Sequence, residues 1–257
     1  MLLLLLHEKE GASLLISVFS PIWFLEMLLI PLALWLLTRS LRRKSREEKL
    51  RALWLFSIYA IVYLVVYKTI LFLDSGYDAQ FFNELPINLC NLSLFFALIA
   101  ARKDCRFLQA FLFYICPLGA LMALLMPCDG FYDVPFWLPR CIGYWGFHLA
   151  VPVLSLAFTT SGLYRPRYRD IPAALGVLLG IALFDHGVNV LLRPSLCPEA
   201  NYCFTFGIEG NPLTEFLMRL IPVPALYLLP LMIPAALVLC AMCWLANLPY
   251  RKNAKAV

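Results

Sequence analysis

Seven long apolar stretches alternate with short polar connections along this chain, a pattern that predicts seven helices packed as a bundle. The stretches are residues 12–38, 50–73, 85–101, 106–126, 136–160, 171–192 and 221–247. A helix that crosses a bilayer needs about 20 predominantly apolar residues, and all but the stretch 85–101 meet that length. We therefore expect an all-α polytopic membrane protein, in which residues 1–257 form a single integral membrane domain and a seven-transmembrane-helix bundle.

Composition supports this reading and excludes an ordinary soluble domain. Hydrophobic residues make up 62% of the chain and charged residues only 14%, with a mean hydropathy of +0.80. The net charge of +5 does not indicate nucleic acid, because the basic residues are concentrated in alternate connections. These are 39–51, 102–106, 165–169 and the segment after residue 250. The positive-inside rule then predicts an outside N-terminus and a cytoplasmic C-terminus. The short loops of the protein and this charge bias fit a multi-pass protein of a cell membrane, such as a bacterial inner membrane.

Polar side chains recur within the apolar stretches, mostly in their outer halves. Ionisable and amide groups at membrane depth are costly, so they usually mark a site or a pathway. Counting residues from each helix end places them in one polar zone that opens toward the outer face. They are Glu26, Lys68, Asn88, Cys90, Asn91, His148, Asp185, His186 and Asn189.

Spacing groups three of these residues on one helix. Asp185 and Asn189 are four positions apart and share a helix face, and His186 and Asn189 are three apart and are also neighbours. Lys68 has the sign needed to neutralise either Glu26 or Asp185, since an unpaired ammonium in this environment would lose its proton.

The zone has the groups needed for acyl-ester chemistry. A thiol or hydroxyl would attack the ester while His148 accepts its proton. Cys90 is the first candidate nucleophile, before Ser93 and Thr69. An Asp185–His186 pair is a second acid–base candidate. Asn88 or Asn91 would donate to the developing oxyanion, and the predicted substrate-binding residues are Asn88, Asn91, Asn189, Lys68 and Glu26.

Structural roles remain open for the same residues. The asparagines can simply bond neighbouring helices, Lys68 can snorkel to the interface, and Cys90 can be a small buried apolar residue. A Cys197–Cys203 disulfide is plausible if the outer face is oxidising. The pair Cys240 and Cys243 has no second pair and no histidine nearby, so no metal and no cofactor are expected.

The longest outer segment, 193–220, is of a length often found in lids and binding segments. Asn211 followed by Pro212 predicts a short helix over Asn211–Leu220, because asparagine caps helices and proline suits the first turn.

The run Leu85–Cys90 (LPINLC) resembles the YwaF family of bacterial integral membrane proteins and, more distantly, the transmembrane-protein-164 acyltransferases of eukaryotes. Further similar features follow in the same order, over about residues 85–250. They are Gly119–Leu125, the aromatic-rich helix with His148, the turn Tyr164–Pro166, Asn189, Asn201–Tyr202 and Asn211–Pro212.

The resemblance implies a seven-helix bundle with a membrane-embedded site, which in the eukaryotic relatives moves acyl chains between phospholipids through a cysteine. His148 matches a family histidine, and Cys90 matches the bacterial pattern. Asn88 stands where the family usually has histidine, and Ile87 stands where the eukaryotic proteins have their catalytic cysteine. These two departures put inheritance of the cysteine mechanism in doubt.

Two classes of function, and a third without catalysis, fit these observations. The first is a lipid-modifying enzyme, an acyltransferase or hydrolase, whose partners are membrane lipids and an acyl-lipid substrate. The second is a proton-coupled carrier that uses Glu26, Lys68, Asp185 and His148. The third is a protein that binds lipid or solute without catalysis. Because the polar residues thin out in the inner halves, where a carrier also needs access, the sequence favours the enzyme.

Overall fold

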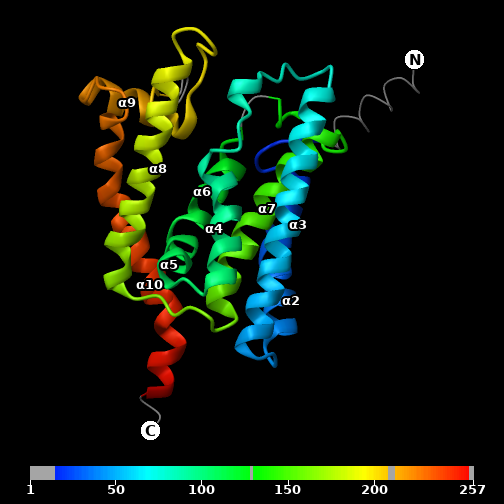
Figure 1. Cartoon of the computed structure of the whole chain (residues 1–257), viewed down its shortest axis with the longest axis vertical. Coiled ribbons are helices and arrows are strands. Elements are labelled where there is room, and N and C mark those ends of the chain that lie inside the picture. Colours follow the sequence, from blue (N-terminus) through cyan, green and yellow to red (C-terminus); the bar gives the residue numbers. More distant parts are fainter. Residues whose placement is uncertain (1–14, 128–129, 208–211, 255–257) are drawn as a thin grey trace.

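The computed structural model describes residues 15–127, 130–207 and 212–254, and its backbone is mostly helical (Figure 1). The helices are α2 (Pro21–Leu41), α3 (Arg46–Leu73), α4 (Leu89–Lys103), α5 (Arg106–Tyr114), α6 (Cys116–Leu125), α7 (Pro139–Thr160), α8 (Ile171–Leu192), α9 (Pro212–Leu220) and α10 (Met232–Ala254). Short 3₁₀ turns are η1 (Phe81–Asn83), η2 (Tyr168–Asp170), η3 (Tyr202–Phe204) and η4 (Leu226–Leu231). Strands β1 (Leu15–Ile16) and β2 (Val134–Pro135) form a small antiparallel pair that the all-α prediction did not include.

Six helical segments in the described ranges are long and apolar enough to cross a membrane, which makes the chain a multi-pass membrane protein. They are α2, α3, α5 with α6, α7, α8 with η2, and η4 with α10. The stretch predicted as 85–101 forms α4, which at 15 residues is shorter than a bilayer requires. Of the seven predicted spans, six therefore have the necessary length.

The three basic connections of the sequence meet at one end of the bundle. Arg46 donates to Asp104 at 2.7 and 2.8 Å and to the Leu163 carbonyl at 3.4 Å. Lys49 donates to the Ser161 carbonyl at 2.9 Å. These contacts join the α2–α3, α4–α5 and α7–α8 connections. The basic residues that the sequence concentrates in alternate connections therefore lie together at one end of the folded bundle. The opposite end is the one that the charge bias predicts to be outer.

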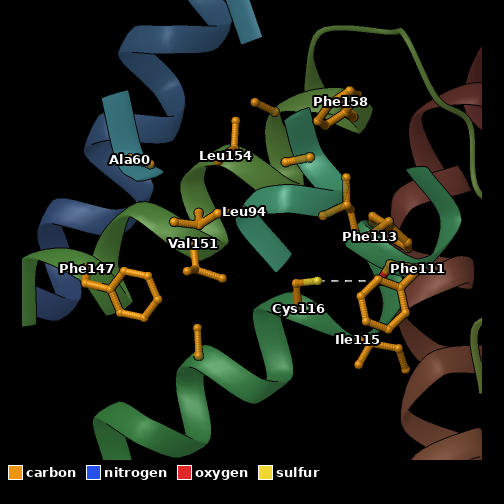
Figure 2. Packing of buried hydrophobic residues seen from close by; sticks show 14 of the residues in the cluster. Ala60, Leu94, Phe111, Phe113, Ile115, Cys116, Phe147, Val151, Leu154 and Phe158 are labelled. Carbon is orange, nitrogen blue, oxygen red and sulfur yellow. Dashed lines mark hydrogen bonds between the residues drawn. The ribbon is translucent and has the colours of Figure 1, made fainter. Parts of the chain in front are cut away.

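Helix α7 is the centre of the molecule and the most buried of the candidate spans. Its apolar side chains pack against α3, α4 and α5, as Figure 2 shows for Phe147, Val151, Leu154 and Phe158. Indole and phenol groups anchor its first turns to neighbouring segments. Trp145 Nε1 donates to the Phe131 carbonyl at 2.9 Å, and Tyr144 Oη donates to the Ala123 carbonyl at 2.8 Å. Most side chains on α7 are therefore enclosed by neighbouring segments.

Proline positions explain where the predicted helix bounds were wrong. The stretch 106–126 is two helices, because Pro117 has no N–H to donate and its ring clashes with the carbonyl four residues earlier, so α5 ends at Tyr114 and α6 begins at Cys116. The last stretch, predicted as 221–247, begins as a 3₁₀ turn containing Pro230, and α10 starts only at Met232.

Capping geometry decides the starts of the other helices. Helix α2 begins at Pro21, because the Ser20 hydroxyl accepts from the Trp23 N–H at 3.2 Å; the predicted start at residue 12 lies outside the described residues. Pro86 precedes α4 instead of lying in its first turn, and Asn88 is the N-cap residue. Helix α9 begins at Pro212 as its sequence predicts, while Asn211 is outside the described residues.

Gly143 on α7 allows α3 to approach closely, and this contact yields a testable prediction. A Cβ at Gly143 would lie 2.2 Å from Cδ2 of Tyr67, a buried ring stacked on Phe147. Gly143→Ala is therefore expected to lower the free energy of unfolding by about 1–3 kcal/mol through overpacking. Denaturant titration in detergent measures this change.

The matched control is Gly176→Ala on α8, where nothing lies within 4 Å of an added Cβ. The same substitution there is expected to raise stability by about 0.5–1 kcal/mol, since alanine is the better helix former. Equal changes in the two variants would contradict the packing argument.

Candidate functional site

His148 lies within α7, and its hydrogen bond fixes which ring nitrogen carries the proton. Nδ1 is 2.9 Å from the Tyr144 carbonyl oxygen. A carbonyl only accepts, so Nδ1 carries the hydrogen, and Nε2 of the neutral ring has the lone pair. The ring is 8% exposed and lies between the aromatic rings of Tyr144 and Phe147, at centroid distances of 4.3 and 4.9 Å. The His148 imidazole is thus fixed in orientation, and its Nε2 can accept a proton.

A charged group on α3 acts electrostatically on this histidine. The Lys68 ammonium on α3 is close enough to the His148 ring to interact with it electrostatically. Lys68 is paired with Glu84, whose other carboxylate oxygen accepts from the Tyr77 hydroxyl at 2.9 Å. The Lys68 and Glu84 side chains are only 17% and 9% exposed. The expected pairing of Lys68 with Glu26 or Asp185 is therefore wrong, since Glu84 occupies that role.

The polar face of α8 holds the loop around η3. Asn189 is fully buried, and its side chain bonds both backbone groups of Tyr202, donating to the carbonyl at 2.9 Å and accepting from the N–H at 2.8 Å. It also donates to the Thr205 hydroxyl at 3.0 Å, and His186 Nδ1 lies 3.0 Å from the same hydroxyl. Asn189 and His186, predicted from spacing to be neighbours, thus share one partner in this loop.

Cys203 occupies the centre of that loop in an unusual backbone conformation. Its φ and ψ are 50° and 21°, and the following Phe204 also has a positive φ of 54°. Side chains other than glycine rarely adopt this region, and such positions cluster at functional sites. The thiol lies beside the Asp185 carboxylate and near the Leu89 backbone N–H at the start of α4. Burial and the adjacent carboxylate raise the pKa of Cys203, so the sulfur keeps its proton at neutral pH.

Asp185 is fully buried on α8, and neither of its carboxylate oxygens has a hydrogen-bond partner within the described part of the chain. The neighbouring Cys203 thiol is close but lacks the geometry of a hydrogen bond. Buried carboxylates are normally paired or hydrogen-bonded, so an unpartnered one requires a functional explanation.

The segment 82–85 connects two sets of side chains. We call them the histidine group (His148, Lys68 and Glu84) and the thiol group (Cys203, Asp185, His186 and Asn189). Glu84 in this segment pairs with Lys68. The Tyr202 hydroxyl donates to the Phe82 carbonyl at 2.6 Å and accepts from the Leu85 N–H at 3.1 Å. The segment 82–85 and the turn η3 therefore lie at the same end of the bundle, the predicted outer one (Figure 1).

Of the remaining predicted residues, three lie at the start of α4 and one lies on α2. Cys90 lies near Cys203 and Cys116, on the side of α4 that faces Gly119. Asn88 makes no side-chain capping bond, and Asn91 is buried in α4. Glu26 is half-buried on α2 and interacts with Tyr63, outside both groups. The single zone expected from the sequence is thus two linked groups, with Glu26 separate.

Two nucleophile candidates bond within their own helices. Ser93 Oγ donates to the Leu89 carbonyl at 2.7 Å, and Thr69 Oγ1 donates to the Val65 carbonyl at 2.8 Å. Ile87 packs in a small apolar cluster around Leu192 and Tyr202. Position 87 therefore has an apolar packing role.

Sequence reasoning missed Glu84 and Cys203 as site residues. Glu84 looked like a loop charge, and only its position after the polar run from Tyr77 could have indicated a role. Cys203 was considered as a disulfide partner of Cys197, but both cysteines are free. Among the described residues no group of three or more metal-binding side chains exists.

Comparison with known proteins identifies the family. A model of the TMEM164 family matches residues 13–245. The chain belongs to the TMEM164 family. This is a membrane family associated with lipid acyltransferase activity. Curated proteins and solved structures give no match to the chain.

Proposed function

We propose that this TMEM164-family protein transfers acyl chains from lipid esters at the predicted outer end of its bundle, as a member of the bacterial YwaF-like branch. The observation that carries the proposal is His148, whose Nδ1–H is engaged by the Tyr144 carbonyl and whose Nε2 is left as a proton acceptor. A neutral, oriented imidazole is the commonest general base in enzymes.

The chemistry needs a base at the point where an acceptor hydroxyl attacks an acyl group. Nε2 of His148 accepts the hydroxyl proton as the new ester bond forms, and the proton then passes to the leaving group. The Lys68–Glu84 pair beside the ring has no net charge, so it holds the local geometry without repelling a phospholipid headgroup. A lysolipid hydroxyl gives acyl transfer, and water gives hydrolysis.

The site also suits amphiphilic substrates. The α3 and α7 surfaces near Tyr67 are lined by apolar side chains and face the lipid, including Val66, Ile70 and Ile142. An acyl chain can therefore remain in the hydrocarbon while its ester reaches the polar groups, which avoids the cost of transferring the chain through water.

Reconstitution tests the proposal. The purified protein in liposomes, supplied with a phospholipid that has one labelled acyl chain and an unlabelled lysophospholipid, is expected to produce the labelled acceptor lipid, measured by lipid mass spectrometry. Empty liposomes give the background. Labelled free fatty acid alone would show a hydrolase. If neither product forms and the liposomes take up a solute in response to a pH gradient, the proposed enzyme is wrong and the protein is a carrier.

A further inference from the structure

We propose that Cys203, held against Asp185 at the N-terminus of α4, is the thiol that receives the acyl group as a thioester. This inference rests on the proposed function and assigns its covalent step to a residue that the sequence did not suggest. It is carried by the position of the thiol, by the unpartnered carboxylate and by the backbone that presents them.

Cys203 lies at a partly exposed position, in a loop that hydrogen bonds hold on both sides. Cys203 is partly exposed, whereas the sulfurs of Cys116 and Cys197 belong to buried residues. Its two positive-φ residues are maintained by bonds on either side of the turn. Asn189 holds Tyr202, and the Thr205 carbonyl accepts from the Ala225 N–H at 2.7 Å. Such conformations are energetically unfavourable and persist only where surrounding contacts enforce them.

Asp185 has the position of a base for this thiol. Its carboxylate is fully buried, lies beside the sulfur, and has no hydrogen bond to any other group in the described ranges. A thiol that keeps its proton is a weak nucleophile and needs an adjacent base. In free enzymes such contacts are often long or poorly aligned and tighten only when substrate binds.

The start of α4 has the complementary donors. The Leu89 N–H lies near the Cys203 sulfur. The N-cap residue Asn88 does not cap the helix with its side chain. A tetrahedral oxyanion formed next to the sulfur would meet the Leu89 N–H and the positive end of the helix dipole.

The reaction balances within this set of groups. The Cys203 sulfur attacks the acyl carbonyl of a lipid ester, its proton goes to Asp185, and a C–S bond forms. The C–O bond to the lysolipid then breaks, and Asp185 returns the proton to the departing alkoxide. The products are a Cys203 thioester and a lysolipid alcohol. An acceptor hydroxyl then attacks the thioester carbonyl and gives its proton to His148. The new C–O bond forms, the C–S bond breaks, and the departing thiolate receives that proton, which regenerates the thiol.

Trapping the thioester is the test. The reconstituted protein is incubated with a phospholipid bearing an alkyne-tagged acyl chain, and acylated peptides are located by mass spectrometry before and after hydroxylamine. The tag is expected on the peptide with Cys203, and hydroxylamine is expected to remove it. Cys203→Ala is expected to lose the tag and about 100-fold or more of the transfer rate. Asp185→Asn is expected to lower the rate of tagging by about 100-fold or more.

Matched variants separate the outcomes. Cys105→Ala, a partly exposed cysteine at the opposite end of α4, is expected to keep both tag and transfer. His148→Gln is expected to keep the tag and turn it over slowly. Tagging confined to Cys90, or wild-type transfer by Cys203→Ala, would overturn the inference while leaving the proposed function intact. Absence of both tag and transfer in the wild-type protein would overturn both. Unfolding midpoints verify that each variant is folded.

Discussion

Replacing His148 by glutamine is expected to lower acyl transfer by about 10²–10⁴-fold, the usual contribution of a positioned acid–base group. Glutamine is of similar length, and its amide can donate to the Tyr144 carbonyl as Nδ1 does, but it cannot accept a proton at neutral pH. The rate of labelled-lipid formation in liposomes measures the loss, and the unfolding midpoint reports whether the fold is kept.

The same substitution at His186 is the control for this first prediction. His186 interacts with the Thr205 hydroxyl and stacks on Phe206 at a centroid distance of 5.2 Å, so its replacement loosens the loop without removing the proposed base. His186→Gln is expected to lower the unfolding midpoint and to cause a smaller loss of rate. Equal losses of rate in the two variants would show that loop geometry, and not proton transfer by His148, limits the reaction.

The second large effect concerns the Lys68–Glu84 pair. Lys68→Met is expected to lower the free energy of unfolding by about 3–5 kcal/mol, because it leaves the Glu84 carboxylate as an uncompensated charge in a largely buried position. The double variant Lys68→Met with Glu84→Gln is expected to recover most of that loss, since removing both charges removes the unpaired one. Reversible unfolding in mixed detergent gives the three free energies.

An exposed ion pair of the same protein is the reference. Arg46 and Asp104 are 52% and 37% exposed, so water and salt screen them. Arg46→Met is expected to cost less than about 1 kcal/mol. If Lys68→Met destabilised the protein no more than Arg46→Met, the Lys68–Glu84 pair would be a surface contact and not part of the site.

Helix positions followed largely from local signals. Helix α8 has the bounds predicted for it, 171–192, and α3 and α7 end at or near their predicted residues. These elements depend on apolar composition and on capping residues within a few positions, both of which are visible in the sequence. The largest errors in the helix bounds occurred at Pro117 and Pro230, where a proline within an apolar run changed the backbone without changing the hydropathy.

The candidate site was predictable only in part. His148 and the α8 residues stand out because polar groups are rare within apolar helices. Glu84 and Cys203 do not stand out, since both are in connections where polar residues and cysteines are ordinary. Their importance comes from partners on other elements: Glu84 meets Lys68 of α3, and Cys203 meets Asp185 of α8.

The sequence by itself determined that this is a multi-pass helical membrane protein with polar groups inside its helices, because hydropathy and charge are properties of consecutive residues. Only the tertiary structure decided which of these groups meet. The segment 82–85 links the histidine group to the thiol group through Tyr202 and Lys68, residues distant from each other along the chain. Such contacts depend on how whole helices pack, and helix packing is set by the combined shape of many side chains.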